Sequence, residues 1–168
     1  MAGAKAKATS KSAKSEALIK TGYDEFDHYD WPYYWVTRAN NAYLFELEKR
    51  LKSRGLDIPR WRVLMLLAGS RARSISYLAG EATIKLSTMT RMVQRMEDEG
   101  LVQTQPRATD QRVTEVLLTT RGEKARHTAW EQAVGLYEAS FAGVAAEQIQ
   151  EMNRTLSIIL ENLRTLED

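Results

Sequence analysis

Apolar residues recur at helical spacing between residues 31 and 54, which predicts a long first helix. The recurring positions are Trp35, Ala39, Ala42, Leu47 and Leu51. Pro32 suits the first turn of a helix, where its missing N–H costs no hydrogen bond. Gly55 stands where a glycine commonly ends a helix, because glycine adopts a left-handed backbone conformation without strain.

Three shorter helices are predicted after Gly55. Pro59 opens the first of them, "PRWRVLMLLAG". Ser74 is a suitable N-cap for the second, "SISYLAGEA", because a serine hydroxyl accepts hydrogen bonds from the free N–H groups of a first turn. Ser87 is the expected N-cap of the third, "STMTRMVQRMEDEG", which ends at Gly100.

Two runs of β-type residues follow, 101–104 and 113–118, and a short charged loop joins them. Thr119 or Thr120 then caps a long helix through "RGEKARHTAWEQAVGLYEASF". A last helix is predicted from about residue 145 to residue 166 because one apolar stripe runs along it. The stripe consists of Ile149, Met152, Leu156, Ile159, Leu160 and Leu163.

The predicted order is therefore four helices, a hairpin and two long helices, a mainly α fold with a small β-wing. Two short helices followed by a two-stranded ribbon with a charged tip are typical of a winged helix-turn-helix. In that arrangement the second helix of the pair enters the major groove of DNA. The hairpin tip reaches the neighbouring backbone or the minor groove.

The helix that would enter the groove has two distinct sides. Met89, Val93 and Met96 fall on one side and are expected to pack inward. Hydroxyls, an amide and arginines project from the other sides and suit base edges and phosphates. These candidate DNA-binding residues are Ser87, Thr88, Thr90, Arg91, Gln94 and Arg95. Acids come only in the last turn, which suggests that the start of the helix is kept free of negative charge. An ordinary amphipathic helix with a solvated face is the alternative.

The wing adds two further candidate DNA-binding residues, Arg107 and Arg112, which flank the tip "ATDQ". Asp110 can hold an arginine in place through a charged hydrogen bond. An ordered arginine loses less conformational entropy when it meets a phosphate. The competing interpretation is a surface turn with a weak ion pair.

Charge and composition narrow the function further. The net charge is +2, but from His127 to the end only two arginines face seven acids, so the front of the chain is basic. A basic front favours a polyanion partner, although a random surface imbalance is an equal alternative. No cysteine is present, which excludes a disulfide scaffold and a cysteine nucleophile and fits a cytoplasmic setting. No apolar run reaches membrane-spanning length.

Enzyme signatures are missing from the sequence. It contains no nucleotide-binding loop, no nucleophile elbow and no paired-histidine metal motif. With only His28 and His127, a dedicated metal site is not expected. The chain is therefore predicted to be a non-enzymatic protein without a cofactor.

Three segments together resemble the MarR family of bacterial transcriptional regulators. They are "STMTRMVQRMEDEGLV" (87–102), "RATDQR" (107–112) and "VLLTTRGEKA" (116–125), and "GLDIPRWRVLMLL" (55–67) is similar to the family's second helix. Met96 replaces the usual leucine, whereas the Asp-x-Arg wing and the Leu-Thr-x-x-Gly start of the next helix are kept. The resemblance covers about residues 31–166.

The resemblance implies an intertwined homodimer joined through its N- and C-terminal helices. Such a dimer presents two recognition helices about one DNA turn apart, roughly 34 Å, and reads an inverted repeat. Family members usually repress nearby genes. A small ligand that fits better when the two recognition helices are misplaced lowers the DNA affinity by linkage, and so releases the protein from DNA. The expected division is a flexible basic tail (1–22), an N-terminal dimerisation and ligand region (23–56), the winged helix-turn-helix (57–119) and C-terminal dimerisation helices (120–168). The tail lysines either touch phosphates or are simply solvated.

Aromatic residues are dense in "YDEFDHYDWPYYWVTRANNAYLFE" (23–46), and "DWPYYW" resembles family members that control the catabolism of plant-derived aromatic acids. Rings pack on rings and arginine forks onto carboxylates, so the expected ligand is an aromatic carboxylate or its coenzyme A thioester. The candidate ligand-binding residues are His28, Trp31, Tyr34, Trp35, Arg38 and Trp61. A dimer core built from the same aromatics is the alternative.

One rival function has the same fold. A winged-helix module can bind protein rather than DNA, and its binding is then insensitive to DNA and to salt. The DNA hypothesis predicts an affinity that falls steeply with salt, because phosphate contacts release counterions. The sequence alone leaves repressor and activator open.

Overall fold

The computed structural model describes residues 26–69 and 71–166. The basic tail predicted over residues 1–22 lies outside these residues. The chain divides into two units after Phe45, inside helix α2 (Pro32–Lys52).

The first unit holds a short 3-10 helix, η2 (His28–Asp30), and the first part of α2. Asp27 caps η2, because its carboxylate accepts a hydrogen bond from the N–H of Tyr29 at 2.9 Å. Pro32 is the first residue of α2, as the sequence predicts.

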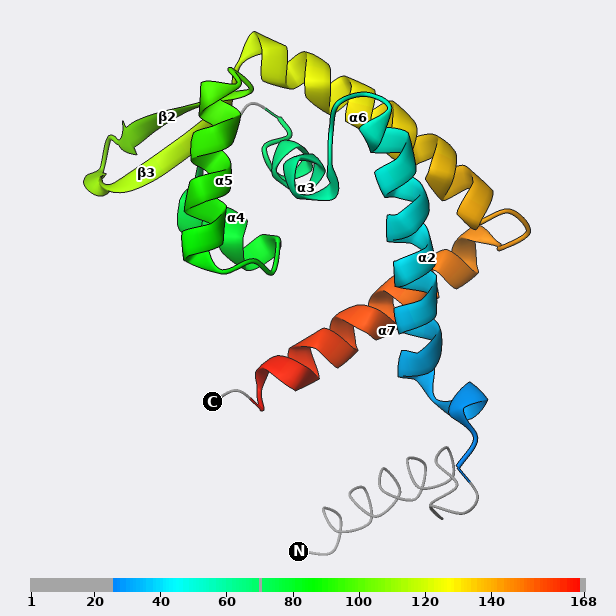
Figure 1. Ribbon diagram of the computed structural model, residues 1–168. Coiled ribbons are helices and arrows are strands. Elements are labelled where there is room, and N and C mark those ends of the chain that lie inside the picture. Colours follow the sequence, from blue (N-terminus) through cyan, green and yellow to red (C-terminus); the bar gives the residue numbers. More distant parts are fainter. Residues whose placement is uncertain (1–25, 70, 167–168) are drawn as a thin grey trace, which may run out of the picture. The chain divides into compact units, whose positions relative to one another are not determined.

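The second unit contains the end of α2 and the winged helix-turn-helix with its two following helices (Figure 1). Gly55 has a φ of 71°, so the chain reverses there and leads into the next helix, as expected. The elements that follow are α3 (Ile58–Leu66), β1 (Arg73–Ser74), α4 (Ile75–Glu81), α5 (Leu86–Asp98), β2 (Val102–Arg107), β3 (Asp110–Leu118), α6 (Thr120–Ser140) and α7 (Ala146–Arg164).

Side-chain caps explain where several of these helices begin. Ser74 caps α4, as predicted, and of the two predicted caps for α6 the structure selects Thr119, whose hydroxyl lies 3.0 Å from the backbone nitrogen of Gly122. The prediction for α5 was wrong, because Lys85 rather than Ser87 is its N-cap. The Lys85 carbonyl accepts the first hydrogen bonds of α5, from Thr88 at 2.9 Å and Met89 at 3.0 Å. Ser87 therefore lies inside the first turn.

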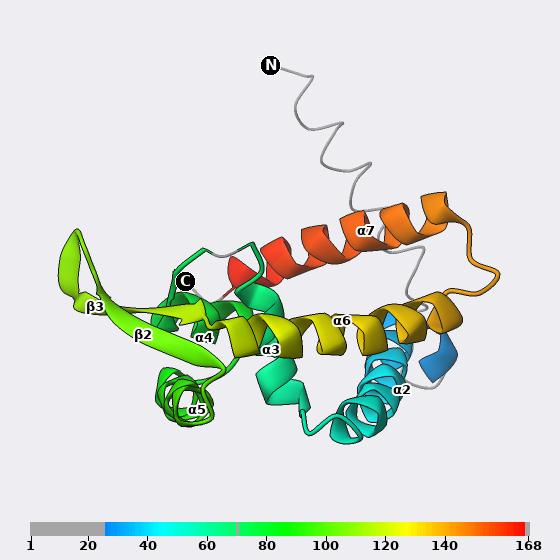
Figure 2. The same cartoon turned by 90° about the horizontal axis from the view of Figure 1, so that it is seen from above.

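The sheet is longer than the sequence predicts. Its strand order is β1-β3-β2, and both contacts are antiparallel. Strands β2 and β3 extend until only Ala108 and Thr109 form the turn, and the hairpin projects beyond the helices in both views (Figures 1 and 2). Pro106 fits within β2 because this is an edge strand, where a missing N–H breaks no ladder. A register shift follows it, between Pro106 and Arg107.

The core of the second unit joins one face of most of its helices with the two hairpin strands. Helix α5 contributes Met89, Val93 and Met96, the three residues that its periodicity assigned to the inner face. The other fully buried large side chains are Leu47, Leu51, Val63, Leu64, Leu67, Leu78, Val102 and Val116. The recognition helix thus packs against α3, α4 and β2.

Gly122 explains how α6 can start against the hairpin. A Cβ at this position would lie 1.8 Å from the Leu101 carbonyl oxygen, a distance that no side chain can occupy. Thr119 closes the same junction, with its hydroxyl 2.6 Å from the Gly100 oxygen and its N–H 3.1 Å from the Leu101 oxygen. The glycine is therefore required by close backbone approach.

The apolar stripe of α7 stays uncovered within one chain. No residue of α7 is buried, and Met152 and Leu160 of the stripe are 41% and 50% exposed. Of the five apolar positions predicted along α2, only Leu47 and Leu51 are buried. Among the described helices, none combines the length and the apolar character needed to cross a membrane.

Candidate nucleic-acid interface

The outer face of α5 is polar and open to solvent. All six residues predicted on it are exposed: Ser87, Thr88, Thr90, Arg91, Gln94 and Arg95. The first turn contains no acid. Its free N–H groups and the positive end of the helix dipole therefore favour a phosphate there.

Two of these side chains are held within the helix. The Thr90 hydroxyl donates to the Leu86 carbonyl at 2.9 Å, and the Gln94 amide donates to Asp98 at 3.3 Å. Arg91 and Arg95 form no ion pair with any residue that the structure describes. The two arginines therefore leave their charge available on this face.

The acids in the last turn of α5 have partners of their own, which sequence reasoning missed. The Glu97 carboxylate accepts hydrogen bonds from the N–H and the hydroxyl of Thr104 on β2, at 2.7 and 2.8 Å. Glu99 accepts from Arg60 on α3. These acids therefore attach the recognition helix to its neighbours, a local role that is independent of the charge at the helix start.

The two wing arginines differ in their surroundings. Arg112 lies beside Asp110, with Nε 3.5 Å from the carboxylate, and its side chain is 95% exposed. Asp110 also accepts a hydrogen bond from the backbone N–H of Arg112 at 3.1 Å. Arg107 instead contacts Glu115 across the hairpin at 2.7 Å and is 39% exposed. Arg112 is therefore the more accessible cation at the tip.

The aromatic residues near the N-terminus form a cluster within the first unit. The His28 ring lies 4.1 Å from that of Tyr29 and 4.7 Å from that of Tyr34, measured between ring centroids. The Trp35 indole donates to the Tyr29 carbonyl at 2.9 Å, and the Arg38 guanidinium lies 5.3 Å from the centre of the Tyr34 ring. Four predicted ligand residues thus come together.

Trp31 has a different neighbour. Its ring meets that of Phe26 edge-on, with centroids 5.9 Å apart. Most of the rings in this unit are about half exposed, including Trp35 at 52%. The cluster therefore offers open aromatic surface rather than a closed cavity.

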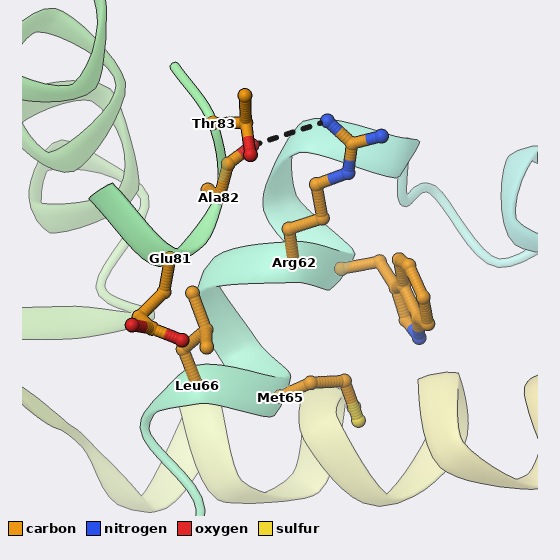
Figure 3. Close-up of a pocket in the computed structure, with 7 residues that line it drawn as sticks. Arg62, Met65, Leu66, Glu81, Ala82 and Thr83 are labelled. Carbon is orange, nitrogen blue, oxygen red and sulfur yellow. Dashed lines mark hydrogen bonds between the residues drawn. The ribbon is translucent and has the colours of Figure 1, made fainter. Parts of the chain in front are cut away.

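Trp61, the remaining predicted ligand residue, belongs to the second unit and lines a pocket there. The pocket has a volume of about 340 Å³ and lies between α3 and the turn after α4 (Figure 3). Its lining residues are Trp61, Arg62, Met65, Leu66, Glu81, Ala82 and Thr83. Sequence reasoning identified Trp61 but gave no signal for the residues of the turn.

Two hydrogen-bond donors of this pocket are poorly satisfied. The buried Trp61 indole N–H has no partner among the described residues. The Arg62 guanidinium donates only to the Ala82 carbonyl, at 3.5 Å (Figure 3). The next residue, Thr83, has a φ of 54°, a conformation that is strained for a β-branched residue. An anionic group would give the Arg62 guanidinium a stronger hydrogen-bond partner than this carbonyl.

Comparisons with known proteins agree on one family. A model of the MarR family matches residues 56–114. The HTH-type transcriptional repressor IacR of Pseudomonas putida is 39% identical over 159 residues, which cover 95% of each chain. The homoprotocatechuate degradative operon repressor of Escherichia coli is 30% identical over 77% of this chain and 88% of its own.

Two solved structures share the fold. CouR from Rhodococcus jostii RHA1, bound to p-coumaroyl-CoA, superposes with a TM-score of 0.72 at 22% identity, covering 77% of this chain and 92% of that one. A mutant of MarR from E. coli, in complex with operator DNA, gives a TM-score of 0.66 at 20% identity, covering 75% of this chain and 91% of that one.

Proposed function

The chain belongs to the MarR family of transcriptional regulators, and we propose that it is a repressor that binds an inverted-repeat operator as a homodimer and is released by a small aromatic acid. The observation that carries this proposal is the exposed outer face of α5, with two uncompensated arginines and no acid in its first turn. Such a face meets the donor and acceptor pattern of the major groove and the phosphates beside it.

The wing supplies the sequence-independent part of binding. Arg112 stands at the exposed tip of a projecting hairpin, where it can reach the DNA backbone or the minor groove. The expected division of labour follows: α5 reads bases, whereas Arg112 adds affinity for any sequence.

A second copy of the chain is the proposed occupant of the open apolar face of α7. In a lone chain this face would expose Met152, Leu156, Leu160 and Leu163 to water, which is unfavourable. A twofold interface buries the same patch on both partners, and it places two copies of α5 in a symmetric relation. A mutant of MarR from E. coli, which shares this fold, has been solved in complex with operator DNA, and this supports the DNA-binding part of the proposal.

An aromatic carboxylate or its thioester is the proposed effector. The homoprotocatechuate operon repressor and the CouR complex with p-coumaroyl-CoA both point to aromatic acids among relatives. In this chain the aromatic cluster around Tyr34 and the pocket at Trp61 and Arg62 offer rings and cationic donors. An effector that prefers the conformation with misplaced α5 helices lowers DNA affinity by linkage.

The test is binding of the purified protein to the DNA upstream of its own gene, against random DNA, at two salt concentrations. Selective binding that weakens with salt is expected, and Arg91→Ala should reduce it. Arg154→Ala on α7 removes the same charge away from α5 and serves as the control. Binding that is unselective and insensitive to salt would replace this proposal with the protein-interaction module.

A further inference from the structure

One arginine joins the start of α3 to the end of the recognition helix. The Arg60 guanidinium contacts both carboxylate oxygens of Glu99, with Nε 3.0 Å from Oε2 and a second nitrogen on Oε1. Its third nitrogen contacts Asp57. Each of the three guanidinium nitrogens thus contacts a carboxylate oxygen. We call Asp57, Arg60 and Glu99 the clamp, because the planar guanidinium holds the two acids in a defined geometry.

The clamp is anchored to the backbone of α3. Asp57 is the N-cap of this helix, and its other oxygen accepts the N–H of Arg60 at 2.8 Å. The Arg60 side chain is only 25% exposed, which reduces screening by water. The hydrogen bond with Glu99 is the main cause that raises the pKa of Arg60 above its ordinary value. The pair is thus stronger than an exposed surface ion pair.

A small displacement at Glu99 matters because α5 acts as a lever. Ser87 and Glu99 are separated by about 18 Å along the helix at 1.5 Å per residue. A tilt of about 5° around the Glu99 end then moves Ser87 by about 1.5 Å. That is larger than the tolerance of a hydrogen bond, whose useful range is about 2.7–3.2 Å.

Space for such a tilt exists beside the clamp. A pocket of about 190 Å³ separates the start of α3 from α5, and Arg60, Thr88, Met92 and Arg95 are among its lining residues. Packing alone therefore does not fill this side of the recognition helix. On the opposite side Glu97 attaches the same turn to Thr104 of the wing.

We propose that Arg60 is a positioning residue for the recognition helix: through Glu99 it sets the tilt of α5, and so the DNA sequence selectivity, without contacting a base. The inference rests on the proposed function, because it takes α5 as the reading element. The main rival is a direct phosphate contact by Arg60, which would add affinity for every sequence and no selectivity.

Two variants with opposite charge changes separate these roles. Arg60→Met removes a positive charge, and Glu99→Gln removes a negative one. A positioning role lowers the ratio of operator affinity to random-DNA affinity in both, by about tenfold, the loss expected when one base contact is misplaced. A phosphate contact instead makes Arg60→Met weaker and Glu99→Gln stronger on all DNA at an unchanged ratio, and this result overturns the proposal. Arg60→Lys keeps the charge but lacks the fork, so it should retain part of the ratio.

Hydrogen exchange tests the clamp without DNA. In Arg60→Met the amides in the last turn of α5 should exchange faster, whereas those in the middle of α6 should not change. Unchanged exchange in α5 overturns the proposal even if DNA binding falls. If the wild-type protein binds no DNA selectively but Arg60→Met still speeds amide exchange in α5, the clamp does position the helix, and it is the proposed function that fails. The thermal unfolding midpoint of each variant confirms that it is folded at the assay temperature.

Discussion

One carboxylate oxygen of Glu97 accepts two hydrogen bonds from Thr104, from its backbone N–H at 2.7 Å and from its hydroxyl at 2.8 Å. The pair links the last turn of the recognition helix to the first half of the wing. Because both residues are partly buried and the acceptor is charged, these bonds are worth more than a neutral surface pair. The helix and the hairpin should therefore move together rather than separately.

Thr104→Val should weaken this link. It removes the hydroxyl donor but keeps the shape and the N–H, and a hydrogen bond to a charged group contributes about 1.5–3 kcal/mol. The free energy of unfolding, measured with urea, should fall by about 1–2 kcal/mol. Thr114→Val on exposed β3 is the matched control and should change little. Equal effects of the two substitutions would contradict the account of this link.

Gly122→Ala should destabilise the protein and Gly135→Ala should stabilise it, although both residues lie in α6. A Cβ at Gly122 would meet the Leu101 carbonyl at 1.8 Å, so the backbone of the junction must shift. At Gly135 the nearest atom is the end of the Arg50 side chain at 3.5 Å. Alanine there should stabilise α6 by up to about 1 kcal/mol, the helix propensity difference. The thermal unfolding midpoints of the two variants test both expectations. An unchanged midpoint in Gly122→Ala would show that the junction between the hairpin and α6 is looser than its geometry indicates.

Arg112→Ala should weaken binding to most DNA sequences alike. The side chain is exposed at the wing tip, so the substitution removes about one phosphate contact and lowers the slope of log affinity against log salt by about 1. Gln94→Ala should instead change which sequence is preferred, by about 1–3 kcal/mol at the affected base pair. Fluorescence anisotropy with operator and random duplexes measures both. If Arg112→Ala leaves affinity for every duplex unchanged, the wing has no role in binding.

Much of this arrangement follows from short-range patterns. The spacing of Met89, Val93 and Met96 placed the inner face of α5 correctly, and Ser74 and Thr119 marked two helix starts. These signals are readable because each depends on neighbours within about one turn of helix. The sequence did not predict β1, because a strand of two residues is too short to show an alternation of apolar and polar positions.

The features that the sequence hid depend on distant partners. Arg60 and Glu99 are 39 positions apart, and nothing near either residue indicates the other. The predicted runs, 101–104 and 113–118, are shorter than the observed strands, because β2 is an edge strand and can continue through Pro106 without losing a ladder hydrogen bond. Arg107 was expected to flank the tip as a DNA contact, but in the longer hairpin its side chain pairs with Glu115. The ends of strands and the pairing of long side chains are thus set by tertiary contacts.

Leu160→Glu on α7 should produce a monomer. The side chain is 50% exposed in one chain, and a charge in a buried twofold interface would appear twice with no partner. Asn162→Glu adds the same charge two positions away, outside the apolar stripe, and should leave the dimer intact. Sedimentation equilibrium gives the masses, and the monomer should also lose high affinity for an inverted repeat. A wild-type protein that is already a monomer at micromolar concentration would refute the dimer.

Arg62→Met should uncouple DNA binding from the effector. The guanidinium is held only by a 3.5 Å hydrogen bond to the Ala82 carbonyl, so a bound carboxylate can draw it away from the turn between α4 and α5. In the wild-type protein, homoprotocatechuate, p-coumarate or p-coumaroyl-CoA should raise the melting temperature and release DNA, because ligand binding stabilises the state it prefers. Arg62→Met should bind operator but respond less to the same ligand, and the neutral amide of the acid should act weakly on both proteins. Arg38→Met in the aromatic cluster is the matched substitution at the other candidate site. If it abolishes the response while Arg62→Met does not, the carboxylate is recognised beside Tyr34, and the pocket at Trp61 is not the effector site.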